Sequence, residues 1–230
     1  MAALPLPTLD ALAGVDARLQ AIDKLEALVN EVVREKTRHR SNVALKRAVR
    51  TWRKGDIVKA GQWALKATDI DSGNSKAFHV LAMALERMGH QHKALITYER
   101  AFELDPEDPE LLINLGLTAW NLKLTDGAKK MFQLYIAACP ESPLGYNNLG
   151  SVLSDLGDQE AAIELLRGAL FRMPEEAMLW NSLATVLAES NRADESLIFY
   201  EEGRGWPQPL RVLFTIWAMP ISISTNSTRR

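Results

Sequence analysis

Residues 105–116 read DPEDPELLINLG, and residues 139–150 read CPESPLGYNNLG. The two stretches align without a gap at a distance of 34 residues, and Pro174 follows Pro140 at the same spacing as Pro140 follows Pro106. Because proline cannot continue a helix but suits its first turn, each stretch is expected to separate one helix from the next. The sequence therefore predicts an internal repeat of helices.

The same period connects positions of similar size along the middle of the chain. Bulky apolar residues recur at Phe78, Leu112, Tyr146 and Trp180 and at Leu81, Leu115, Leu149 and Leu183. Small residues recur at Ala82, Gly116, Gly150 and Ala184 and at Ala94, Ala128, Ala162 and Ser196. Small side chains let another helix approach closely, so this alternation indicates helices packed in pairs.

Self-similarity at this period is typical of tetratricopeptide repeats, in which each unit is two helices joined by a turn. The chain is similar to that family, which implies an all-α fold, a right-handed superhelix (α-solenoid) of about five helix-turn-helix repeats. The expected repeats are 41–74, 75–108, 109–142, 143–176 and 177–204, of which the first is the weakest match. Residues 1–40 are expected to form a leader and an amphipathic capping helix, and residues 205–230 an irregular tail.

Composition limits the class of protein. The formal net charge of −2 over 230 residues gives no global reason to expect nucleic acid or an anionic membrane as partner. Cys139 is the only cysteine, so no intrachain disulfide can form and nothing implies an oxidising compartment. The first residues lack the features of a signal peptide, and the apolar stretch 212–219 is far too short to span a bilayer. We expect a cytoplasmic protein with no membrane partner.

One local charge cluster departs from this balance. Nine basic residues and a single acid, Glu35, lie between Arg34 and Lys54. A basic surface can dock on nucleic acid. The stretch lacks interleaved aromatic residues except Trp52, so nucleic acid is a disfavoured partner.

A long amphipathic helix is expected near the N-terminus. Its apolar residues recur every three or four positions, at Leu12, Val15, Leu19, Ile22, Leu25, Val29 and Val32. This stripe is expected to cap the first repeat by packing on it. The alternative is a homodimer through a helical seam, which Glu26 and Lys36 interrupt as a heptad pattern.

The repeat pattern ends after Glu202, where Gly203, Gly205, Pro207 and Pro209 crowd together. Residues 210–219 could form a short capping helix or a docking segment. The chain could also be a piece of a longer protein whose repeats continue.

Catalytic signatures are missing from the sequence. There is no phosphate-binding glycine loop, no HExxH motif and no paired-cysteine metal spacing. His90 and His92 flank a predicted turn, but two imidazoles alone make a poor metal site. The sequence predicts no enzyme activity, no metal and no cofactor.

Binding is expected in the concave groove that the first helix of each repeat lines in the family that the chain resembles. In the last two repeats the groove positions fall on Leu144, Asn147, Asn148, Ser151, Ser154 and Asp155 and on Met178, Asn181, Ser182, Thr185, Ala188 and Glu189. Across the chain the selected candidates for partner binding are Trp52, His79, Met83, Asn114, Leu117, Trp120, Asn121, Asn147, Asn148, Ser151 and Asn181.

Asparagines and tryptophans give this groove its expected character. Asn114 and Asn148 precede the leucine of adjacent repeats, which resembles the asparagine ladder of O-linked N-acetylglucosamine transferases, where amides hold the backbone of an extended peptide. The other repeats lack this asparagine, so the ladder is incomplete, and exposed polar residues are the alternative interpretation. Trp52 and Trp120 fall at groove positions and could either anchor a ligand or pack on a neighbouring repeat.

The leading hypothesis is a noncatalytic protein-interaction scaffold that binds an extended segment or a helix of a partner protein in its groove. The alternative is the substrate-recognition portion of a protein glycosyltransferase, for example a flagellin-modifying enzyme, whose catalytic domain is not in this chain. Repeats similar to these precede the catalytic domain in that family. The identity of the partner does not follow from the sequence.

Overall fold

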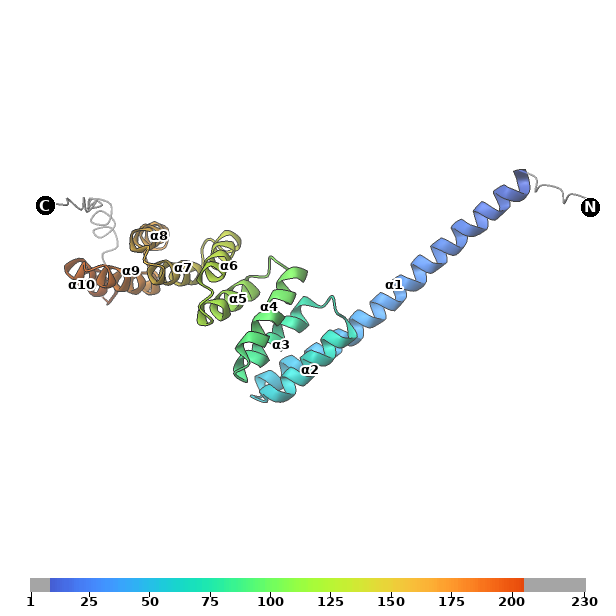
Figure 1. Ribbon diagram of the computed structural model, residues 1–230, viewed down its shortest axis with the longest axis horizontal. Coiled ribbons are helices and arrows are strands. Elements are labelled where there is room, and N and C mark those ends of the chain that lie inside the picture. Colours follow the sequence, from blue (N-terminus) through green and yellow to red (C-terminus); the bar gives the residue numbers. More distant parts are fainter. Residues whose placement is uncertain (1–8, 205–230) are drawn as a thin grey trace, which may run out of the picture. The chain divides into compact units, whose positions relative to one another are not determined.

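The computed structural model describes residues 9–204, which form ten α-helices and the turns between them (Figure 1). The predicted all-α fold is confirmed, with no strand among these residues. The chain divides into two compact units, Met1–His90 and Gln91–Arg230. The predicted tail, 205–230, and the start of the leader, 1–8, lie outside the described residues.

The first unit contains three helices, α1 (Leu9–Arg53), α2 (Ile57–Ile70) and α3 (Ser75–Arg87). The C-terminal part of α1 packs on both α2 and α3. Its core consists largely of alanines, among them Ala44, Ala67 and Ala77, which are at most 3% exposed. Small side chains at these positions allow the three helix backbones to come close together.

Ser41 is the point at which α1 enters this unit. Its buried hydroxyl donates a hydrogen bond of 2.8 Å to the carbonyl of Ala67 on α2. The same hydroxyl accepts a bond of 2.9 Å from the amide of Asn74, whose side-chain oxygen caps α3 through the backbone N–H of Ala77. One polar cluster thus joins all three helices.

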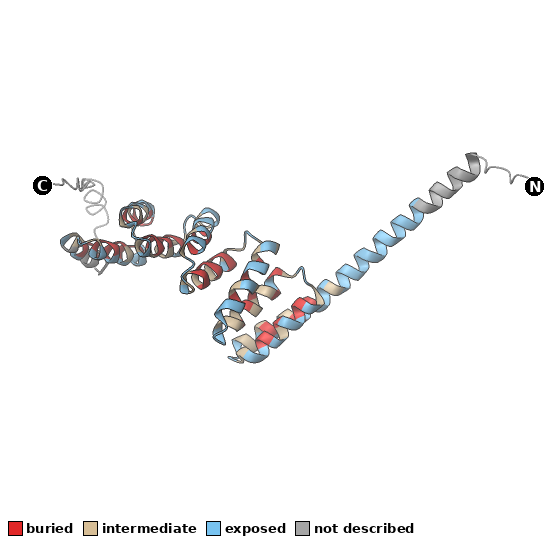
Figure 2. Cartoon of the chain, viewed as in Figure 1, coloured by how far each residue is buried: buried red, intermediate tan, exposed pale blue. Residues whose placement is uncertain are grey.

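The N-terminal part of α1 differs from the expected capping helix. The helix runs without a break through residue 40, so the predicted cap and the first helix of repeat 41–74 are one helix. Neither glycine nor proline occurs between Gly14 and Gly55 to interrupt it. Residues 20–36 are all exposed (Figure 2), so this part of the apolar stripe does not pack on the first repeat as expected.

The described part of the second unit, residues 91–204, forms seven helices that short turns separate. They are α4 (Gln91–Leu104), α5 (Pro109–Asn121), α6 (Thr125–Ala138), α7 (Pro143–Asp155), α8 (Gln159–Arg172), α9 (Ala177–Glu189) and α10 (Ala193–Arg204). Helices consecutive in sequence pack as pairs, α5 on α6, α7 on α8 and α9 on α10, and α7 also packs on α9. The predicted pairing of helices is therefore present in this unit.

The core of the second unit follows the columns of the repeat. Phe132, Leu166 and Leu183 are completely buried in one continuous apolar cluster. The small column explains the tight packing: a Cβ atom built on Gly116 would lie 2.6 Å from the ring of Phe132. Glycine at this position therefore makes room for an aromatic side chain of the next helix.

The turns between the two helices of each repeat share one backbone conformation, which recurs with the same period. Gly55, Gly89 and Gly157 have φ angles of 81°, 83° and 81°, and the two remaining positions of this series are Lys123 at 63° and Asn191 at 59°. All five lie in the left-handed region that favours glycine. The chain thus adopts one turn conformation every 34 residues, even where the sequence supplies lysine or asparagine.

Candidate functional site

A cleft of about 580 Å³ lies in the second unit, where α5, α7 and α9 present their exposed faces. These are the first helices of three successive repeats. The cleft is lined by Trp120 of α5, by Asn147, Ser151, Ser154 and Asp155 of α7, and by Met178, Asn181, Ser182, Thr185, Val186 and Glu189 of α9.

Most of the groove positions expected in the last two repeats line this cleft. Leu144, Asn148 and Ala188 are the expected positions that do not. Val186 is a lining residue that sequence reasoning missed, because it is 3% exposed and belongs to the packing face of α9. The repeat phase identifies polar groove positions. It does not distinguish an apolar residue at the bottom of the cleft from a core residue, because both are buried and apolar.

Three hydrogen bonds cross the cleft from helix to helix. The indole N–H of Trp120 donates to Asp155 Oδ2 at 2.6 Å and joins α5 to α7. Ser182 Oγ donates to Asn147 Oδ1 at 2.5 Å, and Ser154 Oγ donates to Glu189 Oε2 at 2.5 Å, so α7 is joined to α9 twice. These bonds fix the spacing of the helices that form the walls.

The lining is polar, with few charges. Amides and hydroxyls dominate it, and Trp120 and Met178 supply apolar surface. Its charged residues are the acids Asp155 and Glu189, which lie at the C-terminal ends of α7 and α9. The cleft therefore offers hydrogen-bond donors and acceptors along its length and negative charge at one end.

The two asparagines of the predicted ladder, Asn114 and Asn148, do not line the cleft. Asn147 and Asn181 line it, and Asn181 is exposed. Asn148 is half-buried and accepts a hydrogen bond of 3.4 Å from the amide of Asn147. Asn114 is half-buried on α5 and does not line the cleft.

The other candidates of the second unit lie on α5. Leu117 and Trp120 are half-buried and pack partly on the apolar core. Asn121 is exposed at the end of the helix. Trp120 packs partly on the core and also lines the cleft, so the predicted packing role is present, and its role as a ligand anchor stays a prediction.

The candidates of the first unit do not form a comparable site. His79 is 6% exposed, so its side chain is buried and not presented as expected. Trp52 and Met83 are half-buried, and the guanidinium carbon of Arg87 lies 5.6 Å from the centroid of the Trp52 ring. A hollow of about 520 Å³ on α1 is lined by Leu45, Lys46, Val49, Arg50, Arg53 and Lys54.

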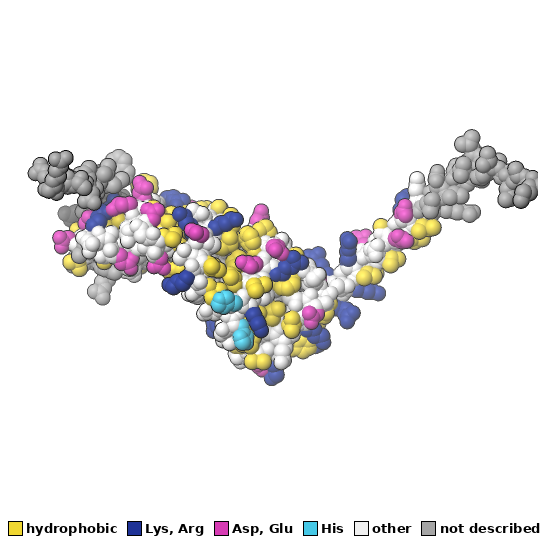
Figure 3. All heavy atoms as spheres, in the orientation of Figure 1, with side chains coloured by type: hydrophobic (Ala, Val, Ile, Leu, Met, Phe, Trp, Pro, Cys, Tyr) yellow, Lys and Arg dark blue, Asp and Glu magenta, His cyan; other side chains and the backbone are white. Residues whose placement is uncertain are grey.

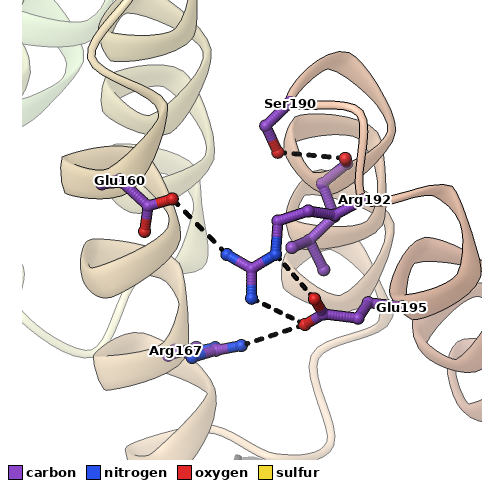
Figure 4. A network of polar contacts seen from close by, with 6 residues as sticks. Glu160, Arg167, Ser190, Arg192 and Glu195 are labelled. Carbon is purple, nitrogen blue, oxygen red and sulfur yellow. Dashed lines mark hydrogen bonds and ion pairs between the residues drawn. The ribbon is translucent and has the colours of Figure 1, made fainter. Parts of the chain in front are cut away.

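A polar network ties α8 to the start of α10 (Figure 4). Arg192 makes two hydrogen bonds of 2.7 Å to the carboxylate of Glu195, and it lies 3.6 Å from Glu160. Arg167 Nη2 lies 3.7 Å from the same Glu195 carboxylate, and burial lowers the pKa of the Arg167 guanidinium. The hydrogen bonds from Arg192 hold the pKa of Glu195 below its usual value. The network lies among residues that hold the last repeat together, not at the cleft.

Two parts of the chain match models of a known helical repeat. Models of the tetratricopeptide repeat match residues 75–118 and 147–209. Protein FlbA of Caulobacter vibrioides is 33% identical over 190 residues, which are 82% of this chain and 31% of FlbA. Human protein O-mannosyl-transferase TMTC3 is 32% identical over 111 residues, which are 46% of this chain and 12% of TMTC3. The chain thus spans less than a third of either relative.

Solved structures show the same fold. A crystal structure of MamA protein aligns with a TM-score of 0.64 and 19% sequence identity, over 71% of this chain and 89% of MamA. MamA from Desulfovibrio magneticus aligns with a TM-score of 0.65 and 16% identity, over 71% of this chain and 93% of that structure. None of the helices described here has both the length and the apolar character needed to cross a membrane. Residues 75–118 and 147–209 are tetratricopeptide repeats, and the chain has the all-α fold of a tetratricopeptide-repeat solenoid.

Proposed function

We propose that the chain is a protein-interaction module whose cleft on α5, α7 and α9 holds an extended segment of a partner protein. The observation that carries the proposal is the lining of this cleft by three successive repeats. An elongated surface built from repeated helices suits a ligand that is itself extended. The fold supports protein binding in general, and the lining residues indicate the mode of binding.

The amides in the cleft suit the backbone of such a segment. Asn147 and Asn181 occupy the same position in successive repeats, and both line the cleft. An asparagine side chain has two N–H donors and two lone pairs on its oxygen, which match a peptide bond without reading the identity of a side chain. Asn147 uses one N–H for Asn148 and one lone pair for Ser182, which leaves one donor and one lone pair for a ligand. Each such bond contributes about 1 kcal/mol, so useful affinity also requires apolar contacts, for which Trp120 and Met178 are available.

The charges of the cleft narrow the class of ligand. Asp155 and Glu189 place two carboxylates at the same end, and among residues 9–204 no lysine or arginine lines the cleft. Opposite charge across an interface favours the correct partner and penalises others. The bound segment is therefore expected to carry a basic side chain where it passes Asp155 and Glu189.

Selection from a displayed library of random linear peptides tests this proposal. Selected peptides are measured against the wild type, against Asn147→Ala/Asn181→Ala, and against the matched control Gln133→Ala/Glu164→Ala, whose two residues are exposed on the second helices of their repeats. The cleft variant is expected to bind about tenfold more weakly or worse, because two hydrogen bonds are lost. Equal binding to all three proteins would show that the peptides use another surface.

The glycosyltransferase alternative and the cytoplasmic location stay predictions. TMTC3 is named as an O-mannosyl-transferase, but the match covers 12% of it. In that alternative the cleft would present a substrate segment to a catalytic domain outside this chain. The same peptide-binding experiment applies to both hypotheses, since each requires the cleft to bind a protein segment.

A further inference from the structure

The N-terminal part of α1 carries an apolar face that no other described residue covers. Apolar side chains lie along this part of the helix (Figure 3). Their exposed fractions are 50% for Ile22, 61% for Leu25, 57% for Leu28, 60% for Val29, 49% for Val32 and 56% for Val33. The helix enters the packed part of its unit only at Ser41, which is buried. A surface of this kind marks a site of protein association.

The helix itself also requires a partner. Most helical stability in proteins comes from packing of an apolar face, and an isolated helix in water is marginal. Residues 20–36 make no such packing in a single chain, since every one of them is exposed. Covering the apolar face would therefore stabilise the conformation that α1 already has.

The spacing of the apolar residues specifies the kind of partner. Ile22, Leu25, Val29 and Val32 follow one another by three, four and three residues, which places them at positions a, d, a and d of a heptad. The two a positions hold β-branched residues, and one d position holds leucine. This combination favours two parallel strands.

The flanking positions are complementary in the same parallel arrangement. A residue at g of one helix meets the residue at the following e of its partner, five positions later. Leu28 at g would meet Val33 at e, which extends the apolar contact to both sides of the seam. Glu35 at g would meet Arg40 at e, which adds an opposite-charge pair on each side.

We propose that α1 pairs with α1 of a second copy of this chain in a parallel two-stranded coiled coil over residues 21–40. Lys36 at a and His39 at d end the apolar seam just before Ser41, and polar core residues of this kind fix register at a cost in stability. Glu26, which was expected to interrupt the heptad pattern, falls at e in this register and lies at the rim of the seam, so of the two expected interruptions only Lys36 occupies a core position. The pairing uses a surface remote in sequence from the cleft, so it does not depend on the proposed function.

The mass of the full chain in solution tests the pairing. Analytical ultracentrifugation of the wild type is expected to give about twice the 25.6 kDa of one chain. Leu25→Glu/Val29→Glu is expected to sediment as a monomer. The control Ala27→Glu/Asn30→Glu adds the same charge on the outward face, at f and b, and is expected to remain dimeric. A monomeric wild type, or a dimer that survives the seam variant, would overturn the proposal.

Exchange of the flanking charges tests the parallel register. Glu35→Arg alone and Arg40→Glu alone each place like charges opposite one another, so each is expected to raise the dissociation constant of its own dimer several-fold. Mixing the two variants restores opposite charges at both flanks, and a mixed dimer is expected to form in preference to either homodimer. In an antiparallel pair residues 35 and 40 do not meet, so no preference for the mixed dimer would contradict the parallel arrangement.

Discussion

The indole N–H of Trp120 on α5 donates a hydrogen bond of 2.6 Å to the carboxylate of Asp155 on α7. The contact holds a large aromatic side chain at the edge of the cleft and keeps a carboxylate beside it. The bond joins neighbouring repeats, and both of its partners line the cleft.

Replacing Asp155 separates these two roles. Asp155→Asn retains an acceptor for the indole and removes the charge, whereas Asp155→Ala removes both. For a selected peptide with a basic side chain, both variants are expected to lose about tenfold in affinity, and calorimetric titration measures the difference. For a neutral peptide, only Asp155→Ala is expected to bind more weakly than the wild type. Unchanged affinity for basic peptides in Asp155→Asn would show that the carboxylate is not used.

Gly116 is not expected to tolerate even the methyl group of alanine. In Gly116→Ala the added Cβ would lie 2.6 Å from the ring of Phe132, which is completely buried, so one of the two helices would have to shift or the ring would have to rotate. Overpacking of this kind costs about 1–3 kcal/mol, more than the gain of about 1 kcal/mol from a better helix former.

Gly168 is the matched control for that substitution. It lies in α8 with no atom within 4 Å of an added Cβ. Gly168→Ala should therefore stabilise the protein by about 0.5–1 kcal/mol, while Gly116→Ala destabilises it, as measured by urea unfolding. The same sign for both variants would contradict the packing described for Gly116.

The turn series predicts a stabilising change at Lys123. Its φ of 63° is unfavourable for a side chain, and the equivalent positions Gly55, Gly89 and Gly157 hold glycine. Lys123→Gly removes a backbone strain of about 1–2 kcal/mol in the folded state, but glycine also raises the conformational entropy of the unfolded chain, which offsets part of the effect. The free energy of unfolding is therefore expected to rise by about 1 kcal/mol or less.

The opposite substitution, glycine to alanine at the equivalent position of another turn, tests whether this backbone conformation lowers the stability of a residue with a side chain. An added Cβ at Gly157 would meet no atom within 4 Å, so Gly157→Ala tests the backbone alone. It is expected to lower the free energy of unfolding by about 1 kcal/mol in urea. A destabilised Lys123→Gly would mean that the lysine side chain contributes more than its backbone conformation costs.

The Arg192–Glu195 contact predicts a pH-dependent contribution to stability. The hydrogen bonds from Arg192 lower the pKa of Glu195 from 4.5. A lowered pKa in the folded state means that the contribution is present above pH 4.5 and is lost as the pH falls through the folded value. Glu195→Gln should therefore cost about 1 kcal/mol near pH 7, and this cost should shrink as the pH falls below 4.5. Glu164→Gln, on the exposed face of α8, is the control and should cost little over the same pH range.

Repeat phase predicted the paired helices and most of the cleft lining, because a solenoid repeats its packing positions and therefore its exposed positions as well. The lining residue Val186 escaped prediction because a buried apolar residue at a cleft floor looks like core. His79 showed the converse, since it holds a groove position but is buried. The exposed stripe of α1 was recognised as apolar, but amphipathicity alone does not say whether a face packs within its own chain or on another.

Photo-cross-linking tests the central claim most directly. A photoreactive amino acid at position 185, an exposed position in the cleft, is compared with the same group at position 133, on the exposed face of α6. With a selected basic peptide, irradiation is expected to give a covalent adduct from position 185 and none from position 133. An adduct that forms equally at both positions, or only at 133, would contradict binding in the cleft.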